Sequence, residues 1–514
     1  MTEGIFRIDA VKKGEKVSDA LRRAGVALPM ECGGAGLCGK CRVTIEDAPA
    51  PCADEKKLLS DEDIKKGVRL ACLTDAAEGM ALTLPLPRAS RGERILAGVE
   101  TESGKEARGA DFSVAVDIGT TTVVAYLVRG GAEKPAAVAS CMNPQREFGA
   151  DVISRISYAS ERDDGLALLH EKIISAINGL IAEITESVGA RRAQISRAVI
   201  SGNTTMEHLF AGVSVRSIGR APFMPEFRVF DTLAPEKLGL ELAPGTPVSL
   251  MPNISGFVGG DIVSGTVYTG LADADELSLF IDIGTNNEMV LGSKDFLLCC
   301  SAAAGPALEG AKISRGMCAA EGAIDHVRLG GGDLAVSTVG NAPAIGICGS
   351  GLVDVVALLL SERIIDPGGK FKKDAEALPG RLDVKNKRWL IDNDVYFTQK
   401  DVREVQLAKG AICTGVEIML AEAGKCLEEV DRIFLAGAFG NYIDVGNASQ
   451  IGILPKVPRE KIIPVGNSSG LGAIECCRDK DFPAKAAKIL ERAKHIELAT
   501  HKDFQQIFVR NLLF

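Results

Sequence analysis

Hydrophobic and polar residues alternate in short runs over the first part of the chain. Apolar side chains recur at roughly every second position in IFRIDAV, KCRVTIED and MALTLPLP, which is typical of strands with one buried face. KVSDALRRAGV has the spacing of a short helix, and SDEDIKKG that of one helical turn. A glycine-rich loop separates the first helix from the second strand. The order of these elements predicts a small α+β domain over residues 1–86.

Two longer apolar segments share one design. FSVAVDIGTTTVVAYLV and LSLFIDIGTNNEMVLG each hold the tetrapeptide DIGT between two apolar runs, which predicts a β-hairpin with a polar turn. The second DIGT begins 165 positions after the first, which indicates an internal repeat of structure. We therefore expect two halves, over residues 112–275 and 276–514. Residues 87–111 are charged and glycine-containing with weak periodicity, so they are predicted to form a linker.

The composition is ordinary for a globular protein of three or so domains. Of 514 residues, 46% are apolar and 25% are charged. The net charge of −9 argues against a nucleic-acid partner, because phosphate binding needs clustered Lys and Arg. The first residues lack the features of a signal peptide, and no apolar run approaches the length of about 18 residues that a membrane span needs. We expect a cytoplasmic protein with no membrane partner.

Four of the 14 cysteines form a pattern typical of metal ligands. Three lie in MECGGAGLCGKC and the fourth in RLACLT, namely Cys32, Cys38, Cys41 and Cys72. Three close thiolates and a fourth from a returning segment match the way a [2Fe–2S] cluster is held. The glycines let the loop turn with positive φ and point its amides at sulfur. Cys52 competes as the fourth ligand, but the strand-like flanks of Cys72 favour Cys72.

Both parts of the chain resemble known folds. The cysteine spacing is similar to that of adrenodoxin-like ferredoxins, which implies an α+β β-grasp ferredoxin domain over residues 1–86. The two DIGT hairpins resemble the phosphate 1 and phosphate 2 loops of the acetate and sugar kinase, Hsp70 and actin superfamily. That resemblance implies an α/β body in which two ribonuclease-H-like halves of an actin/Hsp70-type ATPase close on ATP.

Three further motifs of that superfamily appear in the expected order. SGFVGGDIVSGTVYTG, residues 255–270, resembles the connect 1 helix. RIFLAGAFGNY resembles the adenosine motif, whose Gly437 and Gly440 would let the backbone lie close to adenosine. PVGNSSGLGAIECC resembles connect 2 and contains Gly466 and Gly470. No GxxxxGK[ST] sequence is present, which excludes a P-loop ATPase.

The resemblance implies roles around the phosphates of ATP. Asp117 and Asp282 would hold Mg²⁺ through its waters. Asp261 would orient the attacking water, although capping or pairing near a hinge explains this residue equally well. Amides and hydroxyls of the two turns would cradle phosphate oxygens. These turn residues are Gly119, Thr120, Thr121, Thr122, Gly284, Thr285 and Asn286.

Two other segments are candidates for the nucleotide cleft between the two halves. Gly349, Ser350 and Gly351 precede a helix predicted from about Leu352, and they suit an anion site and a tight strand-to-helix turn equally well. SGNTTMEHLF is predicted to be a strand, a turn and a helix, with Asn203 and Thr204 as candidates to face the cleft.

Taken over its whole length, the chain resembles the reductive activators of corrinoid-dependent methyltransferase systems. The resemblance rests on the cysteine loop, VAVDIGTTTVVAYLV with NPQREFGADVISRI, PNISGFVGGDIVSG, IDIGTNNEMVL and LAGAFGNYIDVGNASQIGILP. It implies that one electron passes from the [2Fe–2S] head to the Co(II) form of a corrinoid protein, restoring Co(I) at the expense of ATP. The implied partners are a corrinoid protein of a methyltransferase or O-demethylase system and an upstream electron donor. Many members of this family are homodimers.

Other functions fit parts of the sequence. A small-molecule kinase of the same superfamily could carry a fused redox domain, and an ATP-dependent electron donor could serve another metalloenzyme. The activators of 2-hydroxyacyl-CoA dehydratases share the ATPase fold but hold a [4Fe–4S] cluster between two subunits. The adjacent pairs Cys299 and Cys300, and Cys476 and Cys477, are predicted to point apart on strands, which argues against such a bridging cluster.

Overall fold

The computed structural model describes most of the chain and divides it into two compact units. It describes residues 5–26, 28, 30, 32–84, 101–102, 111–230, 232–303, 305–310, 312–373, 378–392, 394–437, 440 and 442–514. One unit comprises Met1–Glu93, Met142–Ala176 and His208–Glu226, and the other Arg94–Cys141, Ile177–Glu207 and Phe227–Phe514. Nearly all of the predicted linker lies outside the described residues, and the predicted domain boundaries stay a prediction.

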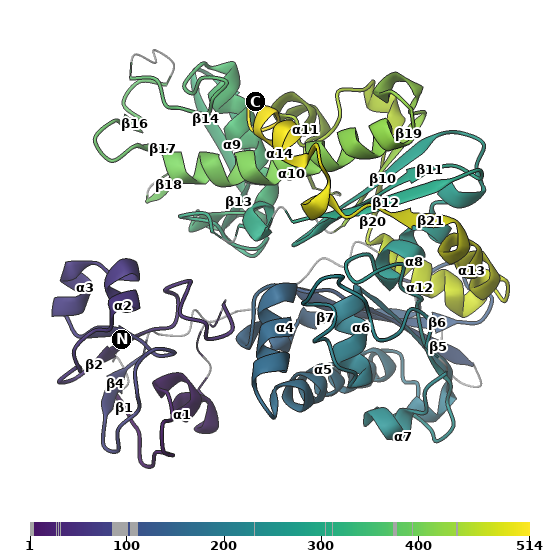
Figure 1. Ribbon diagram of the computed structural model, residues 1–514, viewed down its shortest axis with the longest axis horizontal. Coiled ribbons are helices and arrows are strands. Elements are labelled where there is room, and N and C mark those ends of the chain that lie inside the picture. Colours follow the sequence, from purple (N-terminus) through teal and green to yellow (C-terminus); the bar gives the residue numbers. More distant parts are fainter. Residues whose placement is uncertain are drawn as a thin grey trace. The chain divides into compact units, whose positions relative to one another are not determined.

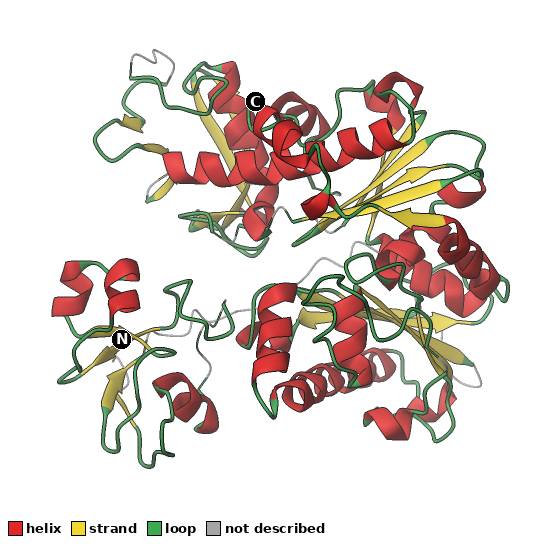
Figure 2. Ribbon diagram, viewed as in Figure 1, coloured by secondary structure: helices red, strands yellow, loops and turns green. Residues whose placement is uncertain are grey.

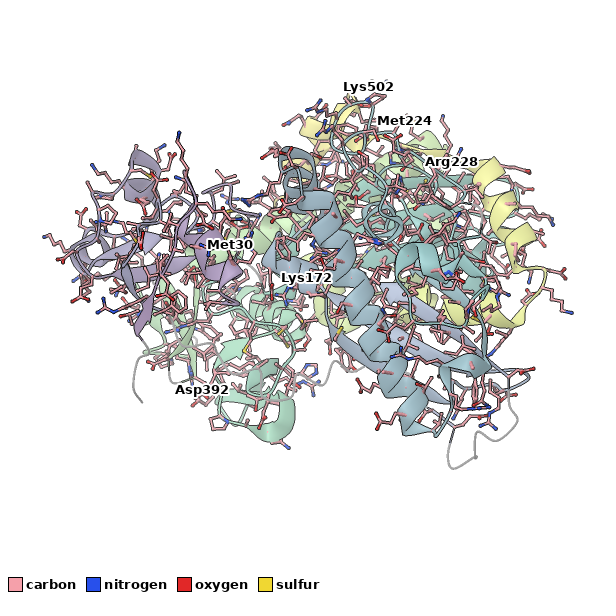
Figure 3. The ribbon with its side chains drawn as sticks, turned by 90° about the horizontal axis from the view of Figure 1, so that it is seen from below. Met30, Lys172, Met224, Arg228, Asp392 and Lys502 are labelled. Atoms are coloured by element: carbon pink, nitrogen blue, oxygen red, sulfur yellow. The ribbon has the colours of Figure 1, made fainter. Side chains whose placement is uncertain are left out.

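The N-terminal head is a four-stranded antiparallel sheet flanked by short helices (Figure 1). The strands, in spatial order, are β1 (Ile5–Arg7), β4 (Ala81–Thr83), β2 (Arg42–Ile45) and β3 (Val68–Leu70), and the helices are α1 (Val17–Arg23), α2 (Ala53–Leu58) and α3 (Asp61–Lys65). Leu21, Leu70 and Leu82 are fully buried in its core, together with Met30, which Figure 3 labels. The elements predicted from residue alternation are confirmed.

Within the same unit, the head contacts helix α4 (Val152–Glu161) and its flanks. Arg162 donates from both terminal nitrogens to the carboxylate of Asp19, over 3.2 and 2.9 Å. Arg22 on α1 lies over the rings of Phe148 and Tyr158, with its guanidinium carbon 5.0 and 5.7 Å from their centroids. These contacts combine an ion pair with cation–π packing.

The first half of the body is a five-stranded sheet in the order β7-β6-β5-β8-β9. Its strands are β5 (Phe112–Ile118), β6 (Thr122–Arg129), β7 (Ala137–Met142), β8 (Ile195–Gly202) and β9 (Val248–Leu250). Strands β5 and β6 form the predicted antiparallel hairpin, whereas β8 and β9 continue the sheet in parallel. The parallel strands are buried, as expected where helices cover both faces of a sheet.

The second half repeats this arrangement in a six-stranded sheet, shown by the yellow arrows of Figure 2. Its order is β20 (Ile462–Gly466), β19 (Arg432–Ala436), β10 (Ser278–Ile283), β11 (Asn287–Gly292), β12 (Leu297–Ala302) and β21 (Ala493–His495). Again the DIGT strand forms an antiparallel hairpin with the next strand and pairs in parallel on its other side. This repeat confirms the predicted pair of halves.

Helices α8 (Gly260–Tyr268) and α12 (Ser468–Arg478) lie between the two sheets (Figure 1). One apolar cluster joins Tyr126 of the first sheet and Phe280 of the second with Ile262 of α8 and Ala473 of α12. Both helices therefore contact both halves of the body. Cys476 and Cys477 lie on α12, so their prediction as strand residues was wrong. Cys299 and Cys300 do lie on a strand, β12, and belong to different apolar clusters.

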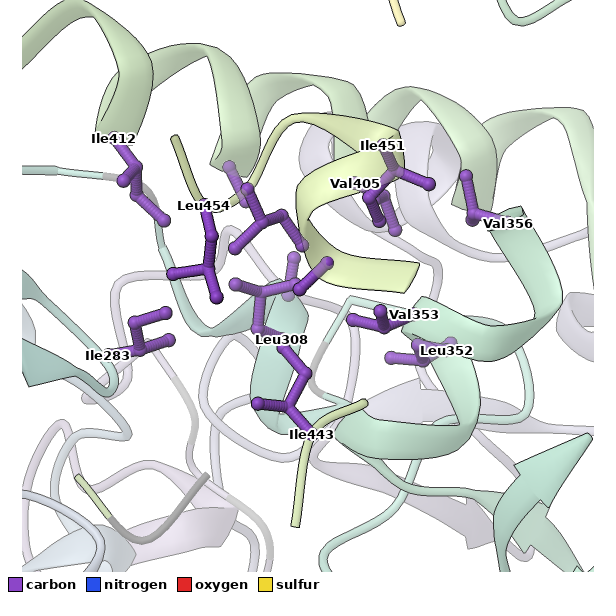
Figure 4. Packing of buried hydrophobic residues seen from close by; sticks show 14 of the residues in the cluster. Ile283, Leu308, Leu352, Val353, Val356, Val405, Ile412, Ile443, Ile451 and Leu454 are labelled. Atoms are coloured by element: carbon purple, nitrogen blue, oxygen red, sulfur yellow. The ribbon is translucent and has the colours of Figure 1, made fainter. Parts of the chain in front are cut away.

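A second apolar cluster fills the outer part of the second half, part of which Figure 4 shows. It includes Leu352 and Val353 of α9 (Gly349–Ser361) and Ile412 of α10 (Gln399–Glu422). Helix α9 begins three residues earlier than predicted.

The other elements are α5 (Gly165–Ser187), α6 (Thr204–Ala211), α7 (Pro235–Leu238), α11 (Val445–Ile451), α13 (Phe482–Arg492), α14 (Phe504–Arg510), β13 (Ala323–Gly330), β14 (Asp333–Thr338), β15 (Gly346–Ile347), β16 (Leu382–Asp383), β17 (Arg388–Asp392) and β18 (Val395–Thr398), with short 3-10 turns between them.

Helix α5 is the one helix among the described residues that is long and apolar enough, by length and composition, to cross a membrane. Its apolar residues, such as Ile173 and Ile177, are buried, whereas Glu171 and Glu183 are exposed. This division into a buried and an exposed face is typical of a core helix in a globular protein.

Candidate cluster and nucleotide sites

The four predicted cysteines of the head come together as two pairs. The Sγ atoms of Cys41 and Cys72 are 3.3 Å apart. The side chains of Cys32 and Cys38 form a hydrogen bond with each other. A negative charge on Cys32 would act on both Cys41 and Cys72. Cys52 is exposed and precedes α2, where its amide donates to Glu55.

The loop around these thiols fits a [2Fe–2S] cluster. Gly33, Gly34, Gly36 and Gly39 all have φ between +62° and +92°, which other residues rarely adopt. A hydrogen bond with Cys38, aided by backbone amides of the loop and opposed by burial, lowers the pKa of Cys32 to about 4. Amides directed at sulfur stabilise the thiolate, which is the form that binds iron. Two thiolate pairs also match the division of four ligands between two irons.

The first DIGT hairpin places Asp117 at the end of β5 against the start of α12. Ser469 Oγ donates to Asp117 Oδ1 and Asn467 Nδ2 donates to Asp117 Oδ2, each over 2.7 Å. Burial nevertheless raises the pKa of Asp117 above its ordinary value. Asn203 Nδ2 donates to Thr120 Oγ1 over 3.0 Å, so Asn203 contacts the first DIGT turn.

The second DIGT hairpin places Asp282 at the equivalent position on β10. Burial raises the pKa of Asp282 to about 8, and the charges of Asp261 and Asp117 add to the effect. Gly437 directly follows β19 and has a φ of +92°. It lies so close to Asp282 that a Cβ at this position would be 2.7 Å from Asp282 Oδ1. Only glycine fits, so the predicted adenosine strand and phosphate 2 hairpin meet at this point.

The glycines of the connect 2 motif allow close packing next to Gly437 and against strand β6. Gly466 ends β20 and its carbonyl accepts the amide of Gly437 over 3.0 Å. The amide of Gly470 donates to Asn467 Oδ1 over 2.9 Å, and a Cβ on Gly470 would lie 2.7 Å from the ring of Tyr126. Gly440 approaches the Ala436 carbonyl, where a Cβ would lie 3.0 Å away.

Several buried carboxyls surround the hairpin turns. Burial raises the pKa of Asp261, in the first turn of α8, to about 7, and the charge of Asp117 contributes. Burial and the charges of Asp261 and Asp282 raise the pKa of Glu288 on β11. Repulsion between these carboxylates adds to the effect of burial on their pKa values. The described residues contain no group of three or more carboxylates that could by itself hold a metal ion. The side chain of Asn287, fully buried beside the phosphate 2 turn, has no hydrogen-bond partner among the described residues.

Glu309, which the sequence motifs do not include, contacts both DIGT turns. Thr121 Oγ1 donates to Glu309 Oε2 over 3.0 Å, and Thr285 Oγ1 donates to Oε1 and Oε2 over 2.9 and 3.0 Å. The two threonine hydroxyls are themselves 3.3 Å apart. The phosphate 1 and phosphate 2 turns therefore meet at one carboxylate. Glu309 lies outside the five sequence motifs described above, so its contacts in the folded protein are what point to it.

The segment Gly349–Gly351 forms the first turn of α9. A Cβ on Gly351 would lie 2.4 Å from the Ile324 carbonyl oxygen, so glycine is needed for close packing against β13. Ser350 is buried, with its Oγ 3.5 Å from Cys348 Sγ. These contacts support a tight strand-to-helix turn.

Comparison with known proteins agrees with this geometry. Residues 4–77 match the 2Fe-2S iron-sulfur cluster binding domain, 112–274 the RACo middle region, and 276–514 the C-terminal domain of RACo, the ASKHA domain. The chain is 37% identical over 418 residues to the corrinoid activation enzyme RamQ of Eubacterium limosum, which covers 78% of this chain and 70% of RamQ. This chain belongs to the RACo family.

Two further RACo-like proteins extend the comparison. The [Co(II) methylated amine-specific corrinoid protein] reductase of Methanosarcina barkeri is 26% identical over 78% of this chain and 77% of its own length. A solved structure, a reductive activator for corrinoid,iron-sulfur protein, is 31% identical with a TM-score of 0.71, over 98% of this chain and 96% of that one. The predicted fold, a ferredoxin-type head on an actin/Hsp70-like body, is confirmed.

Proposed function

We propose that this protein is an ATP-dependent reductive activator that transfers one electron to the Co(II) form of a corrinoid protein and so restores Co(I). The observation that carries the proposal is the presence, in one chain, of a four-thiol loop and a pair of facing DIGT hairpins. Membership of the RACo family supports it, as do relatives whose names describe corrinoid activation and Co(II) corrinoid reduction.

The residues divide between an electron site and a nucleotide site. Cys32, Cys38, Cys41 and Cys72 would hold a [2Fe–2S] cluster, which when bound supplies a one-electron store. Gly119–Thr122 and Gly284–Asn286 would cradle the phosphates of ATP, while Gly437, Gly440, Gly466 and Gly470 shape the adenosine side. Asp117 and Asp282 would hold Mg²⁺ through its waters, because hard cations bound to phosphates keep much of their hydration.

The need for ATP follows from redox chemistry. Ferredoxin clusters of the plant type have potentials near about −400 mV. Base-on Co(II) is harder to reduce, so the transfer is uphill without a second source of free energy. Closure of the two halves on ATP would change the surface that grips the corrinoid protein and favour a state in which a cobalt ligand is displaced.

The proposed setting follows from the same chemistry. The partner is a corrinoid protein of a methyltransferase or O-demethylase system, and an upstream donor reloads the head with electrons. We place the protein in the cytoplasm, with no nucleic-acid or membrane partner. The acidic composition supports the absence of a nucleic-acid partner.

The test is anaerobic reduction of a Co(II) corrinoid protein by the reduced activator, followed by the visible spectrum of cobalt. We expect Co(I) to form with ATP and Mg²⁺ and to form far more slowly without nucleotide. Equal rates with and without ATP would reject the proposal. Rapid ATP consumption that requires a small-molecule acceptor, and yields its phosphate ester, would instead identify a kinase.

A further inference from the structure

Glu309 occupies the place where the two phosphate turns converge. Its carboxylate accepts the hydroxyls of Thr121 and Thr285, which lie 188 and 24 positions away in the chain. Glu309 ends the 3-10 turn Pro306–Glu309, and its neighbour Leu308 is buried in the apolar cluster of the second half (Figure 4). The core thus fixes the backbone that presents this carboxylate.

The contacts of Glu309 must change when a phosphate enters. A threonine hydroxyl has one hydrogen to donate. If Thr121 and Thr285 donate to phosphate oxygens, they cannot also donate to Glu309. The carboxylate sites that accepted the two threonine hydroxyls can then accept a hydrogen bond from a water molecule beside the terminal phosphate. A carboxylate in that position also repels the phosphate oxygens, so a water molecule between them lowers the energy of the arrangement.

We propose that Glu309 is the general base that orients and deprotonates the water that attacks the terminal phosphate. This inference rests on the proposed ATPase function. The water oxygen forms a bond to the γ-phosphorus while the bond from that phosphorus to the β–γ bridging oxygen breaks, and its electron pair leaves with ADP. Glu309 takes the proton of the water and returns it to the phosphate product, so no other reactant is needed.

Asp261 is placed less well for this role. Its Oδ1 accepts the amide of Ile262 over 2.8 Å, so the helix that carries it already engages the carboxylate. The structure gives no hydrogen bond from either phosphate turn to Asp261 among the described residues. The charge of Asp261 instead acts on Asp282, whose pKa it helps to raise.

The experiment compares Glu309→Gln with Glu321→Gln, which changes an exposed glutamate of the same half. Glutamine keeps the size of Glu309 and an oxygen that accepts from threonine, but it cannot take a proton. We expect ATP hydrolysis to fall about 100-fold or more in Glu309→Gln, within the range for loss of a general base. Binding of a fluorescent non-hydrolysable ATP analogue should be unchanged or tighter, because a negative charge has been removed. Glu321→Gln should match the wild type in both assays.

The acid limb of the pH profile gives an independent readout. Protonation of Asp117 or Asp282 also lowers the hydrolysis rate, so both proteins should lose activity at acid pH, but the loss should be less steep in Glu309→Gln because one proton acceptor of the reaction has been removed. Hydrolysis by Glu309→Gln within threefold of the wild type would overturn the inference. A purely structural role would give a different result: Glu309→Ala would lose both ATP binding and hydrolysis, and Glu309→Gln would keep both. That result would also overturn the inference. Wild-type protein that neither binds nor hydrolyses ATP would instead defeat the proposed function.

Discussion

Ser469 donates a 2.7 Å hydrogen bond to Asp117, although 352 residues separate them in the chain. Asp117 is the last residue but one of β5, the first strand of the first half. Ser469 lies in the first turn of α12, which contacts both halves. Asn467 donates to the other carboxylate oxygen. Any movement of α12 is therefore transmitted directly to the carboxylate that is proposed to face Mg²⁺.

The first prediction concerns the charge of Asp117. Asp117→Asn keeps the shape but removes the carboxylate, so Mg²⁺-dependent ATP hydrolysis should fall at least about 100-fold, as for loss of other groups that stabilise transition-state charge. Phosphate release under single-turnover conditions measures this. Ser469→Ala is the matched control, because it keeps the charge of Asp117 and removes only the hydrogen bonds of the Ser469 hydroxyl with Asp117 and Ser201. It should lower the free energy of unfolding by about 1.5–3 kcal/mol and change hydrolysis far less. Wild-type hydrolysis by Asp117→Asn would refute the assignment.

The second prediction separates two cysteines that compete in the sequence. Cys72 is buried with its sulfur beside that of Cys41, whereas Cys52 is exposed at the start of α2. Anaerobically purified Cys72→Ser should lose most of its iron, its sulfide and its visible absorption. Cys52→Ser should keep all three. Iron and sulfide analysis with EPR of the reduced protein decides, and full cluster content in Cys72→Ser would show that another residue supplies the fourth ligand.

Local patterns predicted most of the fold. Each DIGT hairpin could be recognised because its strands and turn are continuous in sequence, so the positions of Asp117 and Asp282 at strand ends followed. Cys72 could be chosen over Cys52 because its own flanks read as a strand. Alternation and spacing carry this information within about ten residues.

Contacts between distant segments could not be predicted in this way. Glu309 meets Thr121 only because the two halves close on one another, and nothing around the glutamate signals a phosphate site. The wrong prediction of a strand at Cys476, which lies on helix α12, has a similar cause. Gly470 and Gly472 disfavour a helix locally, but they let α12 pack tightly against Tyr126 and Ser264. Tertiary packing outweighs local propensity at such positions.

The third prediction concerns the contact of the head with α4. The pair of Asp19 with Arg162 has partly exposed side chains, so it should contribute no more than about 1 kcal/mol. Arg162→Glu places like charges opposite each other and should speed amide hydrogen exchange in α1 and α4 a few-fold. The double variant Asp19→Lys with Arg162→Glu restores opposite charges between these two positions and should recover part of the protection. Recovery is incomplete because Asp19 also pairs with Arg22 over 3.1 Å, and a lysine at position 19 would repel it. Identical exchange in all three proteins would show that this ion pair contributes nothing to docking of the head.

The last prediction follows from Glu207, a fully buried carboxyl on α6. Asn253 Nδ2 donates to its Oε2 over 2.9 Å, while its Oε1 has no hydrogen-bond partner among the described residues. Burial, with the charge of Asp261, raises the pKa of Glu207 well above 4.5. Above pH 4.5 the unfolded chain has lost this proton and the folded chain retains it. The free energy of unfolding must therefore fall as pH rises, until the pKa of the folded state is passed.

Glu207→Gln removes the titrating group and keeps an oxygen that can accept from Asn253. Each group that retains its proton contributes a slope of up to about 1.4 kcal/mol per pH unit. The unfolding free energy of the variant should therefore fall less steeply between pH 5 and pH 8 than that of the wild type. The unfolding free energy of the variant should still fall with rising pH, because the pKa values of Asp261, Asp282 and Glu288 are also raised in the folded protein. Urea unfolding of nucleotide-free protein, followed by circular dichroism at several pH values, measures both slopes. Equal slopes would mean that Glu207 is ionised in the folded protein, and its burial would then require a cationic partner.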